Sequence, residues 1–551
     1  MGAFPRPWRA LAVPALCLAA CTVNVEGAPC TVPGTTVDCP DKQACGNDLR
    51  CSTRALDCKT TGTMCAPSGW QCNTSTEVTE RCDGGDPVCG VKVTDDCGAR
   101  HMVCKVPPGS GACECPDPSS VPTTVTADPG GSPDPSKPPY PRGQASPREC
   151  SFGRLADAIA ALSPTVPGTV EIAGAAGAPV VFGSATGESW PLTIPANVTV
   201  RAALAPAGPT IVRAGPDPGA AGTLLRVSGT LDGVRVEGRG ATGTGVELVC
   251  GAAGVPALLD VAVDGGATLD ASGVVTAGLR AGISVTGTCG GLVQRALVTA
   301  ISGPGLAVEA SAGAGAVQVL GGTFADSEVG IWLRGGTTNV GPDASGATTV
   351  YRNAWMGIAI GGGPDPAAPA VTIPGATIDR ATVNANKGTG VVVARLVEAG
   401  SFVNLLDCSV SENGKLPRVL TRPTGTPAHP VGGVLLALAS SGTFPDFTGN
   451  TLWANGGDQL VIDSGASWSI GPTPSDGCSA LSNAFACVTN GYALALVGGG
   501  SVTSAPYNVW PGPDASGTPW NGFLGPGVTQ PPGPSCNGNI SATPKPPCPP
   551  P

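Results

Sequence analysis

The feature that most constrains the fold of this chain is a glycine followed by a short, largely apolar triplet, which recurs through its middle third. The copies begin at Gly245, Gly282, Gly305, Gly330, Gly357, Gly390 and Gly433. The middle copies are 23, 25 and 27 residues apart, and wider steps of 33 and 43 residues contain proline-rich insertions. A short unit that repeats at a near-fixed period, with insertions at one phase, is typical of a solenoid.

A second short apolar segment ends in a polar residue just before several of these glycines. The polar residues at this phase are Asp326, Asn353, Asn386, Asn413 and Asn455. Asparagine and glycine adopt positive φ angles more readily than most residues, so the pattern predicts sharp turns between short strands. We expect this series to form a structural turn ladder rather than a ligand site.

The alternation of short β-prone segments with asparagine and glycine resembles the right-handed parallel β-helix of the pectin-lyase-like superfamily, over residues 150–510. The resemblance implies an all-β solenoid with a short N-terminal capping helix. Residues 154–162 fit that helix, because Leu155, Ile159 and Leu162 share one helical face. Strands are expected at 168–172 and 197–201. A β-sandwich or a propeller is the alternative, against which the Asn-x-x-x-Gly phase argues.

Composition separates the solenoid from two irregular segments. The 82 glycines and 57 prolines alone would indicate low complexity, but 41% of the residues are hydrophobic and only 13% are charged, unlike a disordered chain. Residues 116–149 contain ten prolines and predict a semi-extended linker, and residues 511–551 predict an irregular tail rich in proline and cysteine. A net charge of −10 without a basic block excludes nucleic acid as a partner.

The first 21 residues indicate an exported protein. Arg6 and Arg9 precede a short apolar stretch that ends in Leu18-Ala-Ala-Cys21. This resembles a bacterial lipoprotein signal, which implies cleavage before Cys21, a lipid on its sulfur and a cell-surface or outer-membrane location, anchored to the membrane rather than spanning it. An ordinary secretory signal is the alternative. No apolar run reaches the length of a transmembrane helix.

Residues 22–115 predict a cysteine-rich disulfide module. Thirteen cysteines lie between Cys30 and Cys115, mostly six to ten residues apart. Zinc is the competing interpretation, but the segment has no Cys-x2-Cys pair and His101 is its only histidine. We therefore expect no metal and no cofactor. Further disulfide candidates in the rest of the chain are Cys250 with Cys289, Cys478 with Cys487, and Cys536 with Cys548; this leaves Cys408 as a small buried hydrophobic residue.

Catalytic residues are hard to find in the solenoid. Enzymes of the superfamily cut polysaccharides with carboxylates, often with Arg, Lys or calcium, yet the hydrolase signature motifs are missing in phase and His429 lies in an insertion. Asp379, Arg380 and Asp407 are weak candidates one repeat apart, but a one-residue offset predicts opposite faces for the two carboxylates. The sequence therefore favours a non-enzymatic rod for binding or adhesion to polysaccharide or envelope partners. A polysaccharide lyase or glycoside hydrolase that uses these three residues is the alternative.

Overall fold

The structure, a computed structural model, describes two units of the chain. It covers residues 28–31, 36, 38–39, 42–45 and 49–60, a set of strands between 68 and 132, and residues 152–508 with gaps. The gaps are 164, 174–178, 203–209, 214–221, 252–253, 270–274, 289, 311–314, 364–369, 397–401, 416–429, 438–445, 464–466, 472–481, 489–490, 498–500 and 505–507. One unit comprises residues 1–120 and 134–151, and the other 121–133 and 152–551.

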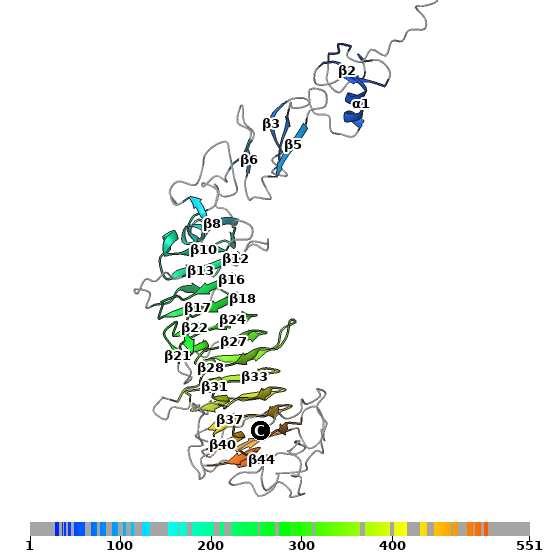
Figure 1. The fold of residues 1–551 in the computed structure, drawn as a ribbon. Helices are drawn as coiled ribbons and strands as arrows, with labels where there is room; N and C mark the ends of the chain where they lie inside the picture. Colours follow the sequence, from blue (N-terminus) through cyan, green and yellow to red (C-terminus); the bar gives the residue numbers. More distant parts are fainter. Residues whose placement is uncertain are drawn as a thin grey trace, which may run out of the picture. The chain divides into compact units, whose positions relative to one another are not determined.

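The first unit consists of small antiparallel sheets and one helix. Its elements are β1 (Ala44–Cys45), β2 (Cys51–Ser52), α1 (Thr53–Thr60), β3 (Ser68–Asn73), β4 (Val78–Asp83), β5 (Val91–Asp96), β6 (Val103–Lys105) and β7 (Ala112–Glu114). β1 pairs with β2, β3–β4–β5 form a three-stranded sheet, and β6 pairs with β7 (Figure 1).

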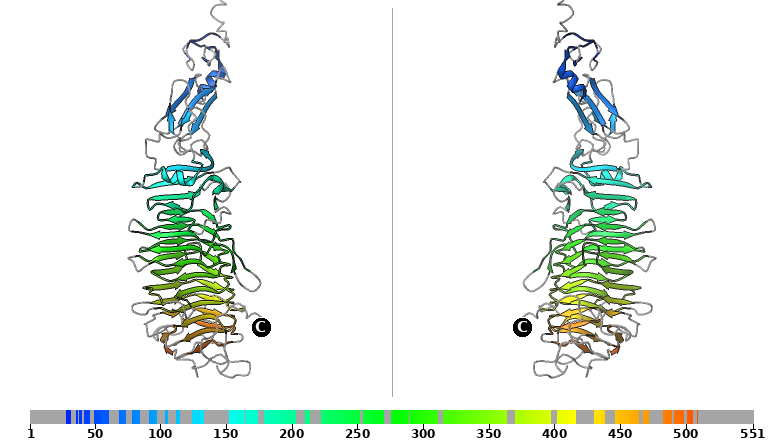
Figure 2. Two further views of the ribbon diagram at one scale, coloured as in Figure 1. Left: turned by 90° about the vertical axis from the view of Figure 1, so that its left-hand side faces the viewer. Right: turned by 90° about the vertical axis from the view of Figure 1, so that its right-hand side faces the viewer.

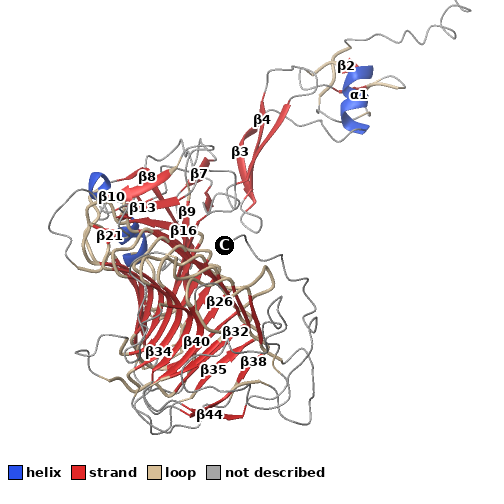
Figure 3. Ribbon diagram, turned by 60° about the horizontal axis from the view of Figure 1, so that its bottom comes forward, coloured by secondary structure: helices blue, strands red, loops and turns tan. Residues whose placement is uncertain are grey.

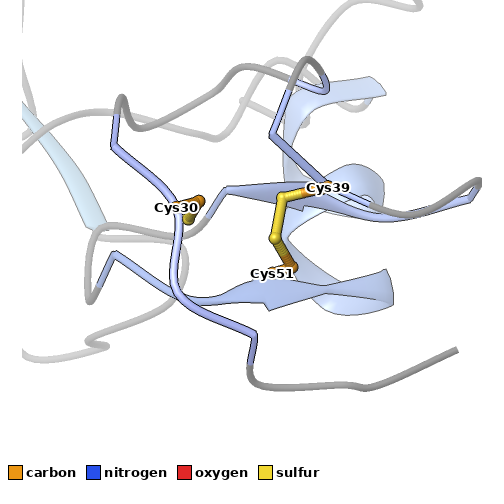
Figure 4. Close-up of side chains that lie close together, drawn as sticks. All are labelled: Cys30, Cys39 and Cys51. Carbon is orange, nitrogen blue, oxygen red and sulfur yellow. A yellow bond between two sulfur atoms is a disulfide. The ribbon is translucent and has the colours of Figure 1, made fainter. Parts of the chain in front are cut away.

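Two disulfides replace a hydrophobic core in the first part of this unit. They join Cys30 to Cys45 and Cys39 to Cys51. Figure 4 shows that Cys30, Cys39 and Cys51 lie close together beside the β1–β2 pair. Cys45 and Cys51 have no exposed surface, so the sulfurs supply the buried centre that so short a segment otherwise lacks. The disulfide-rich character predicted for the N-terminal region is confirmed.

Three parallel sheets of eleven strands each build the second unit. Sheet I contains β8 (Thr124–Ser132), β9 (Gly168–Ile172), β12 (Val198–Ala202), β15 (Thr230–Asp232), β18 (Ala257–Leu259), β23 (Leu292–Gln294), β26 (Val317–Leu320), β29 (Thr337–Gly341), β32 (Gly375–Asp379), β35 (Val403–Leu406) and β38 (Phe447–Thr448). Sheet II contains β10 (Val180–Gly183), β13 (Thr210–Arg213), β16 (Val234–Glu237), β19 (Ala262–Asp264), β24 (Leu297–Thr299), β27 (Thr323–Ala325), β30 (Thr349–Tyr351), β33 (Thr382–Asn384), β36 (Ser409–Ser411), β39 (Thr451–Trp453) and β42 (Ala484–Ala486). Sheet III contains β11 (Leu192–Ile194), β14 (Leu225–Val227), β17 (Thr244–Cys250), β22 (Ala281–Gly287), β25 (Pro304–Val308), β28 (Val329–Leu333), β31 (Met356–Gly361), β34 (Thr389–Ala394), β37 (Val431–Ala437), β40 (Asp458–Asp463) and β43 (Leu494–Leu496).

The chain visits sheets I, II and III in turn, once per rung, and each strand pairs in parallel with its counterpart in the next rung (Figure 2). This is the predicted right-handed parallel β-helix, and the fold class is confirmed. Two small ladders stand outside the three sheets. They are β20 (Thr268–Leu269) with β21 (Val275–Thr276), and β41 (Ser467–Ser469) with β44 (Ser501–Ser504).

Inward-facing apolar side chains stack rung on rung to fill the coil. Val350, Val383, Val410 and Leu452 are successive partners on sheet II, and each is fully buried. A fully buried valine or leucine side chain contributes about 1.5–3 kcal/mol relative to exposure. The recurring triplet of the sequence lies on sheet III, and the second apolar segment lies on sheet II.

A helix begins the coil, as expected. α2 (Leu155–Ala160) buries Leu155, Ala158 and Ile159, and a short 3-10 turn, η2 (Ser184–Thr186), follows β10. The carboxylate of Glu188 accepts the backbone N–H groups of Leu155 and Ala156 at 2.5 and 3.3 Å, so it caps the first turn of α2 from a distant part of the chain. No helix in the described ranges is both long and apolar enough to span a membrane.

The proline-rich segment 116–149 differs from the linker that its composition predicts. β8 lies inside it and pairs in parallel with β9, from Thr124 opposite Thr169 to Ala127 opposite Ile172. Val125 and Ala127 are buried, because the run Thr124-Val-Thr-Ala alternates polar and apolar residues despite its flanking prolines. The first strand of sheet I therefore precedes residue 150, where the sequence places the start of the solenoid.

The recurring glycines are required by packing rather than by a left-handed backbone. A Cβ atom added to Gly357 would lie 2.5 Å from the carbonyl oxygen of Gly390, 2.6 Å from Val383 and 2.8 Å from the side-chain nitrogen of Asn386. Positive φ angles occur instead at the residue before each turn asparagine, such as Arg352 (φ 54°) and Ala385 (φ 51°). Gly330, Gly357 and Gly390 each leave room for the asparagine of the next rung, which explains why the two residue types repeat together over these rungs.

The turn asparagines form a buried hydrogen-bonded ladder between sheets II and III. The side-chain oxygen of Asn386 accepts the backbone N–H of Asn353 at 3.0 Å and its side-chain N–H at 2.8 Å. Asn413 does the same for Asn386, and Asn455 does the same for Asn413. The first position of the ladder is Ser327, whose N–H bonds to the oxygen of Asn353.

Asp326 is therefore not a member of this ladder, which corrects its assignment from the sequence. It has φ 52° and lies one residue before the ladder position, where its carboxylate pairs with Arg352 on the outer surface. The sequence suggests Asp326 because it lies four residues before Gly330, as Asn353 lies four residues before Gly357. The ladder position of this rung is the next residue, Ser327, which a pattern of asparagines does not reveal.

We expect Asn386→Ala to destabilise the solenoid by on the order of 3 kcal/mol, because it leaves the backbone N–H of Asn353 without its acceptor and removes the side-chain donor to the carbonyl oxygen of Val350 in a buried site. The midpoint of chemical unfolding measures this change.

Asn384→Ala is the matched control, because Asn384 lies on the same strand pair but its side-chain oxygen has no hydrogen-bond partner. We expect a change within about 1 kcal/mol for it. Equal shifts for the two variants would contradict a stabilising role for the ladder.

Candidate functional site

The outer face of sheet III is closed over its later rungs. Its central outward column runs through Ala359, Val392, Leu435, Val461 and Ala495, which pair in register. All five are buried, and with Trp332 and Trp355 they form a second apolar cluster outside the coil. A face whose side chains are buried offers no surface to a large ligand.

The outer faces of the early rungs are occupied by ion pairs that join neighbouring rungs. Arg201 pairs with Glu171 on sheet I, and Arg213 pairs with Glu237 on sheet II. Such pairs satisfy each other's charges along the coil axis and leave little unused hydrogen-bonding capacity. This directs attention to the later rungs of sheet I.

Polar, partly exposed side chains form a continuous column on sheet I from β26 to β35. Gln318 pairs with Asn339, Asn339 with Thr377, and Thr377 with Asn404. The strands that carry them lie side by side in Figure 3. Consecutive rungs are separated by about 4.8 Å, so the column offers amide and hydroxyl groups at a regular spacing to anything that lies along it.

A buried glycine, Gly341, lies beside this column. This glycine is paired with Leu320 of the preceding rung and lies beside Asp379 of the next, and it has no side chain to fill the outward position. A Cβ atom there would lie 3.9 Å from the Cβ atom of Asp379 and 4.0 Å from one of its carboxylate oxygens. Asp379 therefore lies next to Gly341, one residue beyond the level of the polar column.

The turn from sheet I to sheet II, here called turn I–II, brings the three catalytic candidates together. Asp379 ends β32 and pairs with Leu406, so Arg380 and Asp407 are the next residues of adjacent rungs. Both have positive φ angles, 47° and 52°. Arg380 donates to one carboxylate oxygen of Asp379 from two nitrogens, at 3.0 and 2.9 Å.

The two carboxylates do not lie on opposite faces, as the alternation of strand residues predicts, but near each other at one edge. The one-residue offset is real, but Asp407 belongs to a left-handed turn, where the strict alternation of a strand no longer applies. The charges of Asp379 and Arg380 both act on the carboxyl group of Asp407 and shift its pKa. The structure thus gathers the three residues at one edge of sheet I.

Asp407 has the unusual electrostatics of the group. Partial desolvation raises its pKa above the ordinary aspartate value, the negative charge of Asp379 raises it further, and Arg380 lowers it. Among the described residues, none makes a hydrogen bond to its carboxylate. An arginine-bound carboxylate beside a second carboxylate of raised pKa is an arrangement suited to acid–base chemistry.

An ion-pair cluster earlier on turn I–II joins neighbouring rungs and serves as a structural comparison. Arg295 donates two hydrogen bonds of 2.6 Å to Asp260 on the adjacent rung and one of 3.3 Å to Asp343. These bonds lower the pKa of Asp260, and bonds from Ser345 with the Arg295 contact lower the pKa of Asp343 to about 2. Arg295 thus joins two rungs, whereas Arg380 bonds to Asp379 of its own rung and makes no hydrogen bond to Asp407.

Gln318, Asn339, Thr377 and Asn404 do not stand out in the sequence. Their strands have no glycine or asparagine at a fixed phase to mark them. The available signal is the strict alternation in runs such as Val317-Gln-Val-Leu320 and Val403-Asn-Leu-Leu406, each directly before a turn.

The cysteines of the second unit have structural surroundings. Cys250 is buried, and its sulfur lies 3.5 Å from the carbonyl oxygen of Gly290. Its position at the inward-facing end of β17 explains this contact. Its expected disulfide partner, Cys289, lies outside the described ranges, so that disulfide stays a prediction. Cys408 is fully buried, and burial raises the pKa of its thiol to about 12. Cys487 is disulfide-bonded.

Several predicted residues lie outside the described part of the chain, and their roles stay predictions. They are Cys21, Cys478, Cys536 and Cys548. Within the described residues, one cluster has metal-ligating atoms close together, the sulfurs of Cys30, Cys39 and Cys51 within 4.8 Å of one another. These sulfurs are engaged in the two disulfides.

Comparison with known proteins gives likenesses of fold only. No family model matches the chain, and no curated protein matches it. The A-module of mannuronan C-5 epimerase AlgE6 from Azotobacter vinelandii is 12% identical over 70% of this chain and 94% of its own, with a TM-score of 0.32. Pectate lyase Pel9A is 13% identical over 70% and 78%, with a TM-score of 0.25. The catalytic unit of a GH87 alpha-1,3-glucanase from Streptomyces thermodiastaticus is 14% identical over 82% and 73%, with a TM-score of 0.28. The parallel strand pairing described above establishes the β-helix independently of these likenesses.

We expect the pKa of Asp407 to respond in opposite directions to its two neighbours. Asp379→Asn removes a negative charge and lowers it, and Arg380→Ala removes a positive charge and raises it. Carbon NMR titration of aspartate carboxyl groups measures both shifts, with Asp407→Asn to assign the signal.

Asp326→Asn on the turn between sheets II and III is the control, because Asp326 pairs with Arg352 and takes no part in setting the pKa of Asp407. Shifts of the same sign for Asp379→Asn and Arg380→Ala would contradict the arrangement described here.

Proposed function

We propose that the second unit is a carbohydrate-active β-helix in which a polysaccharide lies along the outer face of sheet I and is cleaved at Asp379, Arg380 and Asp407. The single observation that carries the proposal is the pairing of an arginine-bound carboxylate with a second carboxylate of raised pKa on the adjacent rung. The polar column from Gln318 to Asn404 supports it, because a polymer that follows the column reaches the two carboxylates.

The residues divide naturally into an acid and a base. Asp407, with its raised pKa, keeps its proton to a higher pH and donates it to the leaving glycosidic oxygen. Asp379, which Arg380 holds in place by an ion pair, accepts a proton as the general base. Arg380, at 62% exposure, also reaches solvent, where it orients the bound chain.

A non-catalytic binding rod is the second candidate. The polar column spans four rungs without a break, so it offers repeated contacts to one polymer even where no bond is cleaved. Both candidates use the same face, and they differ in whether the carboxylates cleave the bound polymer.

The location of the protein is also a proposal. The Leu18-Ala-Ala-Cys21 box supports export and a lipid on Cys21, which would hold the chain at the outer membrane or cell surface and present the β-helix to extracellular or envelope polysaccharide.

We expect Cys21→Ser to move the protein from the membrane fraction to the soluble fraction of the expressing cells, because it removes the only sulfur of the box that can carry the lipid. Fractionation with detergent phase partitioning measures this. Cys17→Ser, four residues earlier, is the control and should stay with the membrane; full retention of the Cys21 variant would refute the anchor.

For the reaction, we expect Asp407→Asn to lower kcat by about 10²–10⁴-fold with ligand affinity nearly unchanged. In the wild type, activity should fall as pH rises through the raised pKa of Asp407, since the acid is then deprotonated. A reducing-end assay over a pH series measures both effects.

Asp264→Asn, in an ion pair with Arg235 on the outer face of sheet II, is the matched control and should leave the activity and its pH profile unchanged. An Asp407→Asn variant that cleaves at the wild-type rate would favour the binding rod instead.

A further inference from the structure

Charge around the site sets limits on the polymer that it can hold. The described parts of β26, β29, β32, β35 and β38 and of the turns that follow them contain three acidic residues and one basic residue. The acids are Asp343, Asp379 and Asp407, and the base is Arg380. The face is therefore net negative, in a chain whose net charge is −10.

The nearby cations are already bound. Arg380 donates two hydrogen bonds to Asp379, and Arg295 is shared between Asp260 and Asp343. A polyuronate has one carboxylate on each sugar, and each needs a cation or several N–H donors when it leaves water. With its arginines engaged, this face would oppose such a ligand by like-charge repulsion.

The polar column has the opposite preference. Amide groups donate and accept hydrogen bonds at the same time, as do sugar hydroxyls, and Thr377 adds a hydroxyl between two amides. The side-chain N–H of Asn404 donates to the hydroxyl of Thr377 at 3.4 Å, so these two members of the column hold each other in place. Neutral hydrogen bonding, and not charge, is what the column provides.

We infer that the substrate of this site is an uncharged glycan and that the reaction is hydrolysis. The inference rests on the proposed function, because it concerns the same three residues. Elimination needs a uronate carboxyl group next to the carbon that loses its proton, and a neutral sugar has none. In hydrolysis, the oxygen of water bonds to the anomeric carbon and the glycosidic C–O bond breaks. Asp407 gives its proton to the leaving oxygen, and Asp379 takes a proton from the water.

The test compares neutral and acidic polymers with the full-length protein. The neutral probes are soluble β-glucan, α-glucan and mannan, and the acidic probes are polygalacturonate and alginate. We expect at least one neutral glycan to bind at least about tenfold more tightly than either polyuronate in affinity electrophoresis, with affinity insensitive to salt. New reducing ends should form without the ultraviolet absorbance of unsaturated uronides.

A charge introduced into the column sharpens the test. Asn404→Lys should strengthen polyuronate binding and weaken neutral-glycan binding, because it places an unpaired cation between Thr377 and Asp407. Thr382→Lys, on the outer face of sheet II, adds the same charge away from the column and should do neither. Circular dichroism and the unfolding midpoint establish that both variants are folded.

The outcomes separate the inference from the proposed function. Cleavage of a polyuronate that depends on Asp379 and Asp407 would overturn the neutral-glycan inference and leave the enzyme proposal standing. Binding of a neutral glycan without any product would support the ligand class and overturn hydrolysis. Equal, salt-sensitive binding of both polymer classes would overturn the inference as well.

Discussion

The structure depends on one backbone constraint, the left-handed residue that turns the chain from most central strands of sheet I into sheet II. Positive φ angles occur at this turn in Gly233, Asp260, Arg295, Gly321, Arg380, Asp407 and Gly449. A non-glycine residue in this conformation costs on the order of 1–3 kcal/mol. The coil offsets the cost, because the N–H of each such residue continues the parallel ladder: Arg380 donates to Leu406 at 2.8 Å and Asp407 to Thr448 at 2.9 Å.

This constraint also decides where chemistry can be placed. Where the left-handed residue of a rung is not glycine, its side chain points outward at the same point of the rung, so side chains of neighbouring rungs such as Arg380 and Asp407 meet along one edge. Where an arginine meets an aspartate of the neighbouring rung, as at Arg295 and Asp260, the result is a rung-to-rung clamp. Arg380 instead bonds to Asp379, the residue directly before it. The carboxylate of the next rung, Asp407, is therefore not bound by this arginine.

The sequence carries clear signals for two of the three sheets and none of the same kind for the third. Sheets II and III are punctuated by asparagine and glycine, because the buried side chain of Asn386 needs the open space at Gly357. Sheet I has no such coupling before Cys408, and its outward residues differ from rung to rung. The same absence of punctuation hides β8, whose alternation stands among prolines. The proximity of Asp379 and Asp407 escapes prediction for a different reason, because strand alternation does not hold for a residue that belongs to a turn.

A second asparagine ladder connects the site to the end of the coil. It lies on turn I–II, where Asn450 accepts from the N–H of Cys408, Asn483 from Asn450, and Asn508 from Asn483. Both ladders begin with a residue that has only a small polar group, Ser327 in one and Cys408 in the other. No earlier ladder residue donates to the side chain of the first member, so that side chain needs no acceptor atom and only has to donate. The thiol of Cys408 does so, to the carbonyl oxygen of Ile378 at 3.3 Å. Cys408 directly follows Asp407, and burial keeps its thiol protonated by raising the pKa to about 12. This buried thiol therefore has a structural role, since it fixes the turn that holds the candidate acid in place.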